Sequence, residues 1–455
     1  MTVRAMMAGS LVGPGDPSYD EARQVFNGMI DRRPALIAQC ESRDDVVTAL
    51  ALAADRGWEV AVRAGGHSAA GFGVTEGGLV IDLRRMAAVE VDSARKVATV
   101  AGGATWADVD RACAPYGLAT TGGRVSTTGV AGLTLGGGSG WLERSFGLAC
   151  DNVLSAEVVT VDGRVVVASE DENPELFWAL HGGGGNFGVV TELTFRLHPL
   201  QTTTLGLLFW PPDAGPEVTR AYRDLLEGDA PDALGGGSAY LTGPPEEFVP
   251  PHLVGKLAHA AVVVYAGEEG AARDSIASLL ALAPDSAMIT PMPYADIQSA
   301  LDDPPGFRNY WSAEHLMALP DEAIDLVHAA SAHMVVPSPS QQILIPWGGA
   351  LAQETADWPL PHRRTQWVVH PLGLWTDPAD DARGIAWARD LCASVRPYAT
   401  GDVYLNFTGD EGHERVVAGL GAANYRRLEE VKTAYDPENR LHLNHNIAPA
   451  LTPVG

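Results

Sequence analysis

Short apolar runs alternate with helical segments between residues 40 and 200. Ser42, followed three residues later by Asp45, predicts a helix start, because the serine hydroxyl can accept a hydrogen bond from an unpaired amide of the first turn. Gly57 is typical of the residue just after a helix, so the helix is expected to end there. Strands are expected at 59–63, 78–83, 88–92 and 96–102.

A second helix and a hairpin are indicated further along. Thr105 can cap a helix that ends at Gly117. The dipeptide Asp162-Gly163 between two β-branched runs is a strong hairpin signal. A helix over 174–180 is then expected to lead, through a glycine run, into a strand over 189–199.

The pattern changes near residue 200. Prolines punctuate the chain, the glycine loops stop, and amphipathic helices alternate with strands such as 258–267 and 366–375. Residues 201–400 are therefore expected to form a second domain of the α+β class. The last stretch, 401–455, contains an aromatic strand, DVYLNF, and a helix over 424–435, and is expected to fold back onto the first domain.

Length and charge narrow the class of protein. A chain of 455 residues is long enough for roughly two or three domains. Its net charge of −26 repels phosphate backbones and anionic lipids, so nucleic acid and membrane partners are not expected. The N-terminus lacks the pattern of a signal peptide, and no apolar run is long enough to span a bilayer, so a cytoplasmic location is expected.

The four cysteines are scattered and none has C-x-x-C spacing. A zinc or iron–sulfur site is therefore not expected, and no metal ligand is assigned. The cysteines are interpreted as reduced core residues rather than as a disulfide framework.

Three glycine-rich stretches hold most of the chemical information. The first, RAGGHS (63–68), follows a strand, and consecutive amides in such a loop form a concave anion site suited to a pyrophosphate. A tight turn with a surface histidine explains the same residues equally well. The second, 121–141, has eight glycines among small and apolar residues, so burial against a large planar ligand or very close packing is expected rather than a flexible loop.

The third stretch, HGGGGNFG (181–188), formally contains G-x-G-x-x-G. A nicotinamide-dinucleotide site requires a strand before this motif and a helix after it. Here a helix is expected before it and a strand after it, and no acidic residue follows at the right distance. The stretch is therefore interpreted as a turn between two elements.

Five segments together resemble a known family, the berberine bridge enzyme-like FAD-linked oxidases, which have the vanillyl-alcohol oxidase fold with a PCMH-type FAD-binding domain. The resemblance covers nearly the whole chain. The segments are RAGGHSAAGFG (63–73), TGGRVSTTGVAGLTLGGGSGWLERSFGLACDNV (121–153), GGGGNFGVVTELTFRLHP (182–199), VYLNFTGDEG (403–412) and NYRRLEEVKTAYDPENRLHLNHNI (424–447).

The resemblance implies an α+β protein with a two-part FAD-binding domain. That domain would be made from residues 1–200 and from the returning C-terminal segment 401–455. Residues 201–400 would form the substrate domain, an antiparallel sheet covered by helices that packs over the flavin ring.

The resemblance also implies how FAD is held. In this family the histidine of the first segment is bonded to the flavin 8-methyl carbon, and that position is His67. Many relatives add a second bond from a cysteine in the second segment, but the matching position is Val125, which cannot form a thioether. A single covalent attachment through His67 is therefore implied. The other implied cofactor contacts are Arg63, Gly65, Gly66, Ser68, Thr128, Gly129, Gly132, Gly138, Val190 and Asn444.

The family's chemistry is oxidation of a substrate by hydride transfer to flavin N5, usually followed by reoxidation by O2. Tyr404 in YLNF is the first candidate for the base, with a packed strand tyrosine as the alternative. Gln353 and Glu354, on an expected strand over 348–355, are the second candidates, and only one of them would face the substrate.

The substrate is the least determined part of this interpretation. Tyr310 and Trp311 are candidate pocket walls, with a buried aromatic pair as the alternative. Aromatic residues at positions 210, 310, 311, 347, 367 and 375 favour a pocket for a secondary metabolite over a polar groove for an alcohol or a sugar. Thr128, small and polar beside the expected reactive flavin carbon, favours O2 as the acceptor. The alternatives are a dehydrogenase with another acceptor and a flavin-binding protein without turnover.

Overall fold

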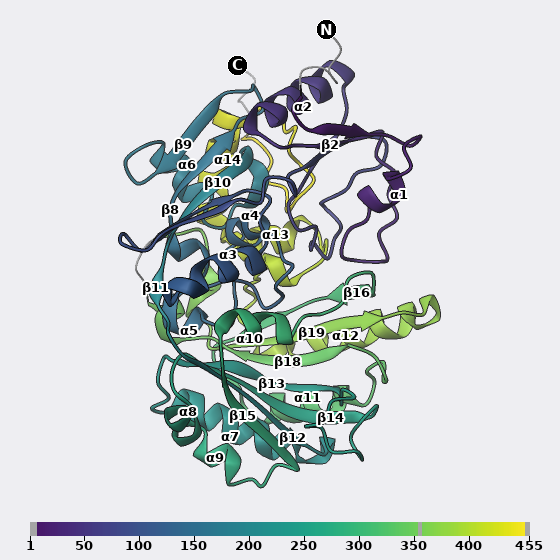
Figure 1. Cartoon of the computed structure of the whole chain (residues 1–455). Coiled ribbons are helices and arrows are strands. Elements are labelled where there is room, and N and C mark those ends of the chain that lie inside the picture. The colour runs from purple at the N-terminus through teal and green to yellow at the C-terminus, as the bar shows by residue number, and fades with distance from the viewer. Residues whose placement is uncertain (1–6, 354–356, 451–455) are drawn as a thin grey trace.

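The computed structural model describes residues 7–353 and 357–450. It has two lobes, one above the other in Figure 1. The upper lobe contains the N-terminal part of the chain together with the C-terminal helices α13 (His413–Leu420) and α14 (Ala422–Tyr435), and the lower lobe contains the middle of the chain. Within the described ranges, no helix is long and apolar enough to cross a membrane.

The first sheet of the upper lobe has the strand order β1-β2-β4-β3. Its strands are β1 (Ser10–Val12), β2 (Leu36–Gln39), β3 (Val60–Arg63) and β4 (Leu79–Asp82). The helix α1 (Tyr19–Ala22) connects β1 to β2 in the chain, and the helix α2 (Arg43–Arg56) connects β2 to β3. The Ser42 hydroxyl accepts a hydrogen bond from the Asp45 amide at the start of α2, and Gly57 follows its end in the left-handed conformation. Both ends of this helix are as the sequence predicted.

The second sheet is antiparallel and has the order β5-β6-β10-β8-β9. Its strands are β5 (Val89–Asp92), β6 (Val97–Ala101), β8 (Val153–Val159), β9 (Val165–Ser169) and β10 (Val189–Arg196), and β7 (Leu118–Ala119) pairs with β11 (His198–Pro199) beside it. The expected hairpin joins β8 to β9, with Gly163 at a φ of 84°. The helix α3 (Trp106–Cys113) begins where expected, with the Thr105 amide and hydroxyl both donating to Asp108.

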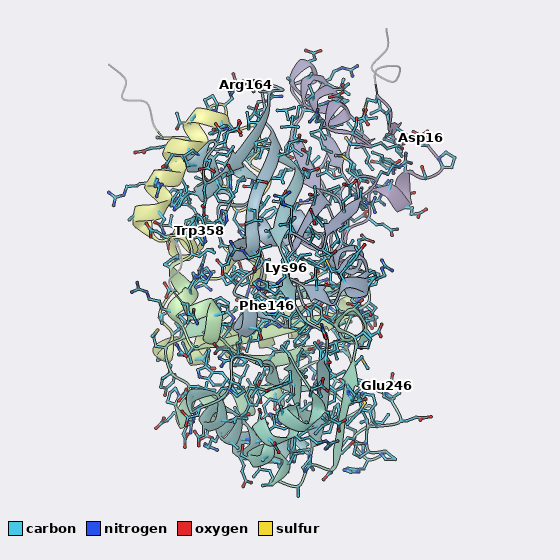
Figure 2. All side chains as sticks on the ribbon, turned by 60° about the vertical axis from the view of Figure 1, so that its left-hand side comes forward. Asp16, Lys96, Phe146, Arg164, Glu246 and Trp358 are labelled. Atoms are coloured by element: carbon cyan, nitrogen blue, oxygen red, sulfur yellow. The ribbon has the colours of Figure 1, made fainter. Side chains whose placement is uncertain are left out.

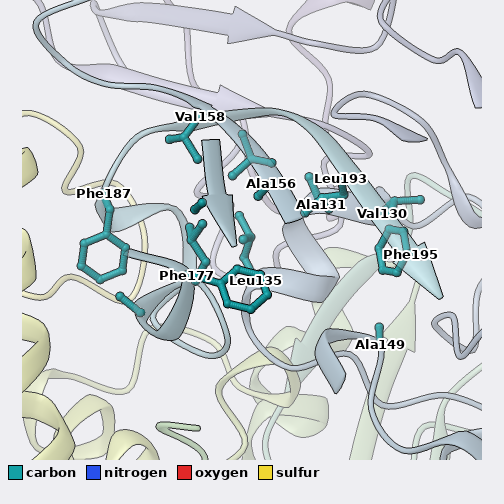
Figure 3. Packing of buried hydrophobic residues seen from close by; sticks show 14 of the residues in the cluster. Val130, Ala131, Leu135, Ala149, Ala156, Val158, Phe177, Phe187, Leu193 and Phe195 are labelled. Atoms are coloured by element: carbon teal, nitrogen blue, oxygen red, sulfur yellow. The ribbon is translucent and has the colours of Figure 1, made fainter. Parts of the chain in front are cut away.

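Most residues of the glycine-rich stretch 121–141 are buried, as the sequence predicted, and the stretch contains the helix α4 (Val130–Leu135). The helices α5 (Glu143–Phe146) and α6 (Pro174–Ala179) follow it. Leu135 belongs to an apolar cluster with Phe177 of α6 and Phe195 of β10 (Figure 3). Leu428 of α14 joins the same cluster, so the C-terminal helices share a core with the glycine-rich stretch.

The lower lobe is built on one antiparallel sheet with the order β15-β12-β14-β13-β18-β19-β16, and β17 also pairs with β19. The strands are β12 (Thr203–Trp210), β13 (Leu234–Thr242), β14 (Leu257–Tyr265), β15 (Ser286–Met292), β16 (Arg308–Trp311), β17 (Glu314–Leu316), β18 (Gln341–Pro346) and β19 (Trp367–Trp375). The helices are α7 (Gly215–Glu227), α8 (Glu269–Ser275), α9 (Ala277–Leu280), α10 (Tyr294–Ala300), α11 (Asp321–Ser331) and α12 (Asp381–Val395).

The two faces of this sheet have different partners. On one face, Leu344 of β18 packs in a cluster with Ile324 of α11 and Leu391 of α12. On the other face, Ile345 of β18 packs in a cluster with Tyr404 of the upper lobe. The structure therefore confirms an α+β fold whose antiparallel sheet is covered by helices on one side.

Buried polar contacts fasten the lobes together around α5. Arg144 is buried and donates hydrogen bonds to the carbonyl oxygens of Leu234, at 2.8 Å, and Trp347, at 2.9 Å. Phe146 stacks on His198 with ring centroids 4.3 Å apart, at the level where the lobes meet (Figure 2).

Two expected strands are wrong. Residues Leu405–Phe407 form a 3-10 turn instead of a strand, because the Asn406 side chain turns inward and donates to the Leu133 carbonyl and to the Tyr404 hydroxyl. Residues Gly349–Ala352 are also a 3-10 turn. Gly348 and Gly349 have φ values of 115° and 57°, which end β18 before the sequence pattern suggests.

Candidate active site

A cavity of about 870 Å³ lies between the two lobes. Its upper wall comes from the three glycine-rich stretches and from the C-terminal tail around residues 441–445. Its lower wall is the face of the large sheet opposite α11 and α12, together with the segment 300–304 after α10. Residues from every part of the chain thus meet in one cavity.

The first two glycine stretches touch through their backbones. A Cβ atom added to Gly129 would lie 2.2 Å from the amide nitrogen of Gly65, and one added to Gly65 would lie 2.3 Å from the amide nitrogen of Gly129. Neither position can therefore carry a side chain without a shift of the backbone. The contact leaves backbone amides of both stretches at the cavity wall, where they can bind an anionic group.

His67 is half-buried at the upper wall of the cavity. Its Nε2 lies 2.9 Å from the Thr127 hydroxyl, its Nδ1 lies 3.4 Å from the Thr128 hydroxyl, and its ring stacks on Phe26 at 4.1 Å. Burial lowers the pKa of His67 to about 4, so the imidazole is neutral at pH 7. The ring is thus held from three sides and uncharged.

Arg63 supports the loop that carries His67. It is 1% exposed, its Nη2 pairs with the Asp82 carboxylate at 2.8 Å, and it also donates to the carbonyl oxygens of Ala22 and Gln24. Its charge is therefore balanced within the protein, and its part in the cavity wall is that of a rigid support.

A buried lysine holds the C-terminal tail against the third glycine stretch. Lys432 of α14 is 0% exposed and donates to Asp436 at 2.7 Å, to the Asn186 carbonyl at 2.8 Å and to the Leu441 carbonyl at 3.0 Å. All three donors of its ammonium group are satisfied. The tail beyond Leu441 is thereby placed at the cavity, where Asn444 and His445 line the wall.

The lower wall is made by alternate residues of the large sheet. Leu205, Leu207 and Phe209 of β12 line the cavity, and Gln341, Ile343 and Ile345 do so on β18. This period of two is that of one face of a strand. Most of the sheet residues that line the wall are apolar, and His370 of β19 is an exception.

The comparisons with known proteins agree with this architecture. Residues 34–169 match a family described as "FAD binding domain", and residues 403–448 match one described as "Berberine and berberine like". The (R)-6-hydroxynicotine oxidase of Paenarthrobacter nicotinovorans is 33% identical over an alignment 463 positions long, which covers 97% of each chain. The chain belongs to the berberine bridge enzyme-like family of FAD-linked oxidases.

Solved structures of related proteins have the same fold. The 6-hydroxy-D-nicotine oxidase from Arthrobacter nicotinovorans aligns with a TM-score of 0.86 at 29% identity, over 98% of each chain. The berberine bridge enzyme-like protein 1 of Physcomitrella patens aligns with a TM-score of 0.87 at 21% identity, over 99% of this chain and all of the other. Like its relatives, the protein is an FAD-linked oxidoreductase.

The upper wall of the cavity fits the family's cofactor. Backbone amides at Gly65 and Gly129 are available to a pyrophosphate, and the amide oxygen of Asn444 is buried without a hydrogen-bond partner among the described residues. An orphaned polar atom of this kind is expected where a ligand supplies the partner. The third glycine stretch is a turn between α6 and β10, as the sequence predicted, and it also lines the cavity.

All the residues that the resemblance implied as cofactor contacts, except Gly138, lie at the cavity wall. Those at the cavity wall are His67, Arg63, Gly65, Gly66, Ser68, Thr128, Gly129, Gly132, Val190 and Asn444. Gly138 is not at the wall: a Cβ there would lie 2.3 Å from Cβ of Ala149, so the position is glycine for close packing. Its amide donates to the Tyr404 hydroxyl at 2.8 Å.

The first candidate base, Tyr404, lies outside the cavity wall. It is 0% exposed, and its hydroxyl accepts hydrogen bonds from the amides of Gly138 and Ser139, each at 2.8 Å. Burial raises the pKa of Tyr404 further above its ordinary value. This geometry gives its hydroxyl no contact with a molecule in the cavity; what it does is fix the turn at Ser139, which lines the wall.

The second candidate that the structure describes, Gln353, is not at the cavity either. Gln353 is exposed, and it follows the turn that replaces the expected strand. Glu354 lies outside the described residues. Of the aromatic residues expected to form the pocket, Trp311 lines the cavity, whereas Tyr310 packs beside the helices of the lower lobe. The tryptophans at 210, 347, 367 and 375 are buried in the core. Trp210 and Trp367 belong to the cluster beneath the helices, Trp347 packs with Tyr404 of the upper lobe, and the ring of Trp375 lies against Gly384 of α12.

Three side chains that the sequence reasoning did not select form a row in the cavity. The Arg124 guanidinium lies 5.9 Å from the ring centroid of Phe407, and Phe407 stacks on His370 at 4.4 Å. Arg124 donates hydrogen bonds to Glu143 and Ser139, and Nδ1 of His370 donates to the Ser312 carbonyl at 2.8 Å. Burial lowers the pKa of His370 to about 4. A histidine inside the apolar strand 366–375 was the signal that could have revealed this row.

Proposed function

We propose that the protein oxidises a small organic substrate by hydride transfer to flavin N5, holds FAD through a single covalent bond to His67, and passes the electrons to O2. The flavin supplies the redox chemistry, and the protein supplies orientation, proton removal and access. The observation that carries the proposal is the placement of His67 in the cavity wall between Phe26 and the hydroxyls of Thr127 and Thr128.

The state of His67 supports a covalent bond. A neutral imidazole has a free electron pair on one nitrogen, so it can form a bond to carbon, and the lowered pKa keeps it in that state at pH 7. Formation of this bond would be a net two-electron oxidation: His67 would give up its N–H proton, the cofactor would give up one C–H proton, and O2 would take up the two protons and two electrons as hydrogen peroxide. Val125 cannot form a second bond, and neither Cys113 nor Cys150 lines the cavity.

The remaining residues of the upper wall would hold the cofactor and exclude water. Amides of the first two glycine stretches would bind the pyrophosphate, and Asn444 would accept a hydrogen bond from the flavin. Tyr404 acts in this arrangement as a positioning residue, because its hydroxyl fixes Gly138 and Ser139.

The lower wall supports a mainly apolar substrate. Relatives with this fold include one named as a hydroxynicotine oxidase and one named as a chitooligosaccharide oxidase. The alternating Leu205, Leu207 and Phe209 of β12, with Ile343 and Ile345 of β18 in the same sheet, offer few partners for the hydroxyl groups of a sugar chain. A small metabolite is therefore favoured over an oligosaccharide. The four cysteines are free and buried. A cytoplasmic location, where thiols stay reduced, is part of the proposal.

The covalent bond can be tested by denaturing the purified protein and measuring its absorbance and intact mass. The wild type is expected to stay yellow and to carry the mass of one FAD, and His67→Ala is expected to lose that added mass. His445→Ala is the matched control, because it removes another histidine of the upper wall and should keep the added mass. Free release of flavin from the denatured wild type would contradict the covalent bond.

The choice of O2 as acceptor has its own test. The flavin is reduced without oxygen and then mixed with buffer saturated with air, and its absorbance is followed. Rapid reoxidation is expected, and Thr128→Leu should slow it by about tenfold, equivalent to about 1.4 kcal/mol of barrier, because a larger side chain would obstruct the approach of O2. Fast reduction by a substrate with negligible reoxidation would favour the dehydrogenase alternative. If no substrate in a broad screen reduces the flavin, the alternative without turnover is favoured.

A further inference from the structure

Three carboxylates line the cavity wall, those of Glu246, Asp302 and Asp303. None of them forms an ion pair among the described residues, and Asp303 is the most buried of the three. Asp303 lies in the segment 300–304 and is 9% exposed. One of its oxygens accepts a hydrogen bond from Nε2 of Gln341 at 3.2 Å. Among the residues that the structure describes, Asp303 forms no ion pair, and its other oxygen has no hydrogen-bond donor.

The neighbouring Asp302 has a different task. Its two carboxylate oxygens accept hydrogen bonds from the amide of Ser126, at 2.5 Å, and from the Ser126 hydroxyl, at 2.6 Å. Ser126 lies in the second glycine stretch, in the upper lobe. Asp302 therefore fastens the segment 300–304 to the upper wall, while Gln341 of β18 holds Asp303 from the lower wall. Asp303 is fixed from both sides before any ligand binds.

The surroundings of Asp303 are mainly apolar. Leu301 lines the cavity beside it, Ile343 follows Gln341 on the same face of β18, and Leu372 of β19 is the direct cross-strand partner of Gln341. Burial and the charge of Asp302 raise the pKa of Asp303 to about 7. A carboxylate in such a place is stabilised when a cation binds to it.

The protein's own cations in the cavity are already bound elsewhere. Arg124 pairs with Glu143 at 2.7 Å, and Arg63 pairs with Asp82 at 2.8 Å. His370 and His67 are neutral, because burial lowers the pKa of each to about 4. None of these groups supplies a cationic partner for the Asp303 carboxylate, so a cation that pairs with it would come from outside the protein.

We propose that Asp303 binds a positively charged group of the substrate, and that the substrate is an alkylammonium or arylmethylammonium compound with an otherwise apolar body. This inference rests on the proposed function, because it assigns the lower wall to the substrate of the oxidase. Asp303 would orient the substrate by its ammonium end, and the apolar row on β12 and β18 would enclose the rest.

The test measures binding rather than catalytic activity. The FAD-loaded protein is titrated in a calorimeter with benzylammonium chloride and cyclohexylmethylammonium chloride, and with benzyl alcohol and cyclohexylmethanol as neutral counterparts. The wild type should bind at least one of the two cations more tightly than its neutral counterpart. Asp303→Asn should weaken binding of that cation by about tenfold or more and leave the alcohols unchanged, since it removes one close charge pair. Asp303→Glu, which keeps the charge, should restore part of the preference.

Asp296→Asn is the matched control. It removes one negative charge from an exposed position on α10, close in sequence but away from the cavity wall, and it should not change binding of the cation. The proposal is overturned if neither cation binds the wild type, if the alcohols bind equally well, or if Asp303→Asn binds the cation as the wild type does. Loss of FAD from a folded Asp303→Asn would also overturn it, because the residue would then serve the cofactor. If the protein binds cations through Asp303 but no compound reduces its flavin, the binding role of Asp303 stands and the oxidase proposal fails.

Discussion

The two walls of the cavity are built on different principles. In the upper wall, backbone lies against backbone: Gly65 and Gly129 approach so closely that neither can carry a Cβ. In the lower wall, side chains on alternate positions of β12 and β18 make the surface. A backbone wall suits a cofactor that never changes, because its hydrogen-bond donors are independent of side-chain identity. A side-chain wall can be changed one residue at a time, which suits a variable substrate.

The sharpest test of this comparison uses two glycines of the upper wall. In Gly129→Ala, the new Cβ would lie 2.2 Å from the Gly65 amide nitrogen and 2.7 Å from Cβ of Ala64, and rigid neighbours cannot move aside. We expect a loss of about 3 kcal/mol or more in the free energy of unfolding, together with loss of FAD. Denaturant titration and the ratio of FAD to protein measure the two effects.

Gly132→Ala is the matched partner of that variant. Gly132 lies in α4 and lines the cavity, and a Cβ added to it meets no atom within 4 Å. The protein without FAD should be as stable as the wild type or up to about 1 kcal/mol more stable, because alanine favours a helix. FAD should bind less well, since the methyl group would occupy the cavity. If Gly129→Ala is as stable as the wild type, or if Gly132→Ala keeps its full FAD content, the interpretation that backbone atoms form the upper wall and hold FAD is wrong.

Much of the upper lobe could be predicted because its signals are local. Ser42 and Asp45 are three residues apart, and so are Thr105 and Asp108, so their caps are visible in a short window of sequence. The glycine stretches are equally local, and the resemblance that they carry placed His67 in the cavity wall. The prediction of Tyr404 as a base at the cavity failed because it depends on long-range contacts. The Tyr404 hydroxyl accepts from the amide of Gly138, 266 residues away, and nothing near either residue in the sequence shows that the two meet.

The lower wall could not be predicted for the same reason. Asp303 meets Gln341 across 38 residues, and Asp302 meets Ser126 across 176 residues. The period of two on a strand shows which residues share a face, but not which face lies toward the cavity when both faces are buried. Buried aromatic residues such as Trp367 therefore suggested an aromatic pocket, although they face the helices.

The smallest effect on the cofactor is expected on β18, where two neighbouring isomeric residues face opposite ways. Ile343 lines the cavity and is half-buried, whereas Leu344 is 1% exposed in the cluster beneath the helices. Leu344→Ala should cost about 2–5 kcal/mol of stability, because it leaves a void in a packed core, and should leave the relative affinities for ligands of different size unchanged. Ile343→Ala should cost about 1 kcal/mol, because part of that side chain is already exposed, and should shift the preference toward bulkier ligands. Both variants should keep the full FAD content, since neither residue belongs to the glycine-rich stretches of the upper wall.

Calorimetric titration with a graded series of arylmethylammonium salts measures the preference for ligand size. Ile343→Ala could leave the size preference unchanged, or Leu344→Ala could change it as much. Either result would show that the cavity-lining face of β18 does not determine which substrate binds, and would contradict the assignment of the side-chain wall to the substrate.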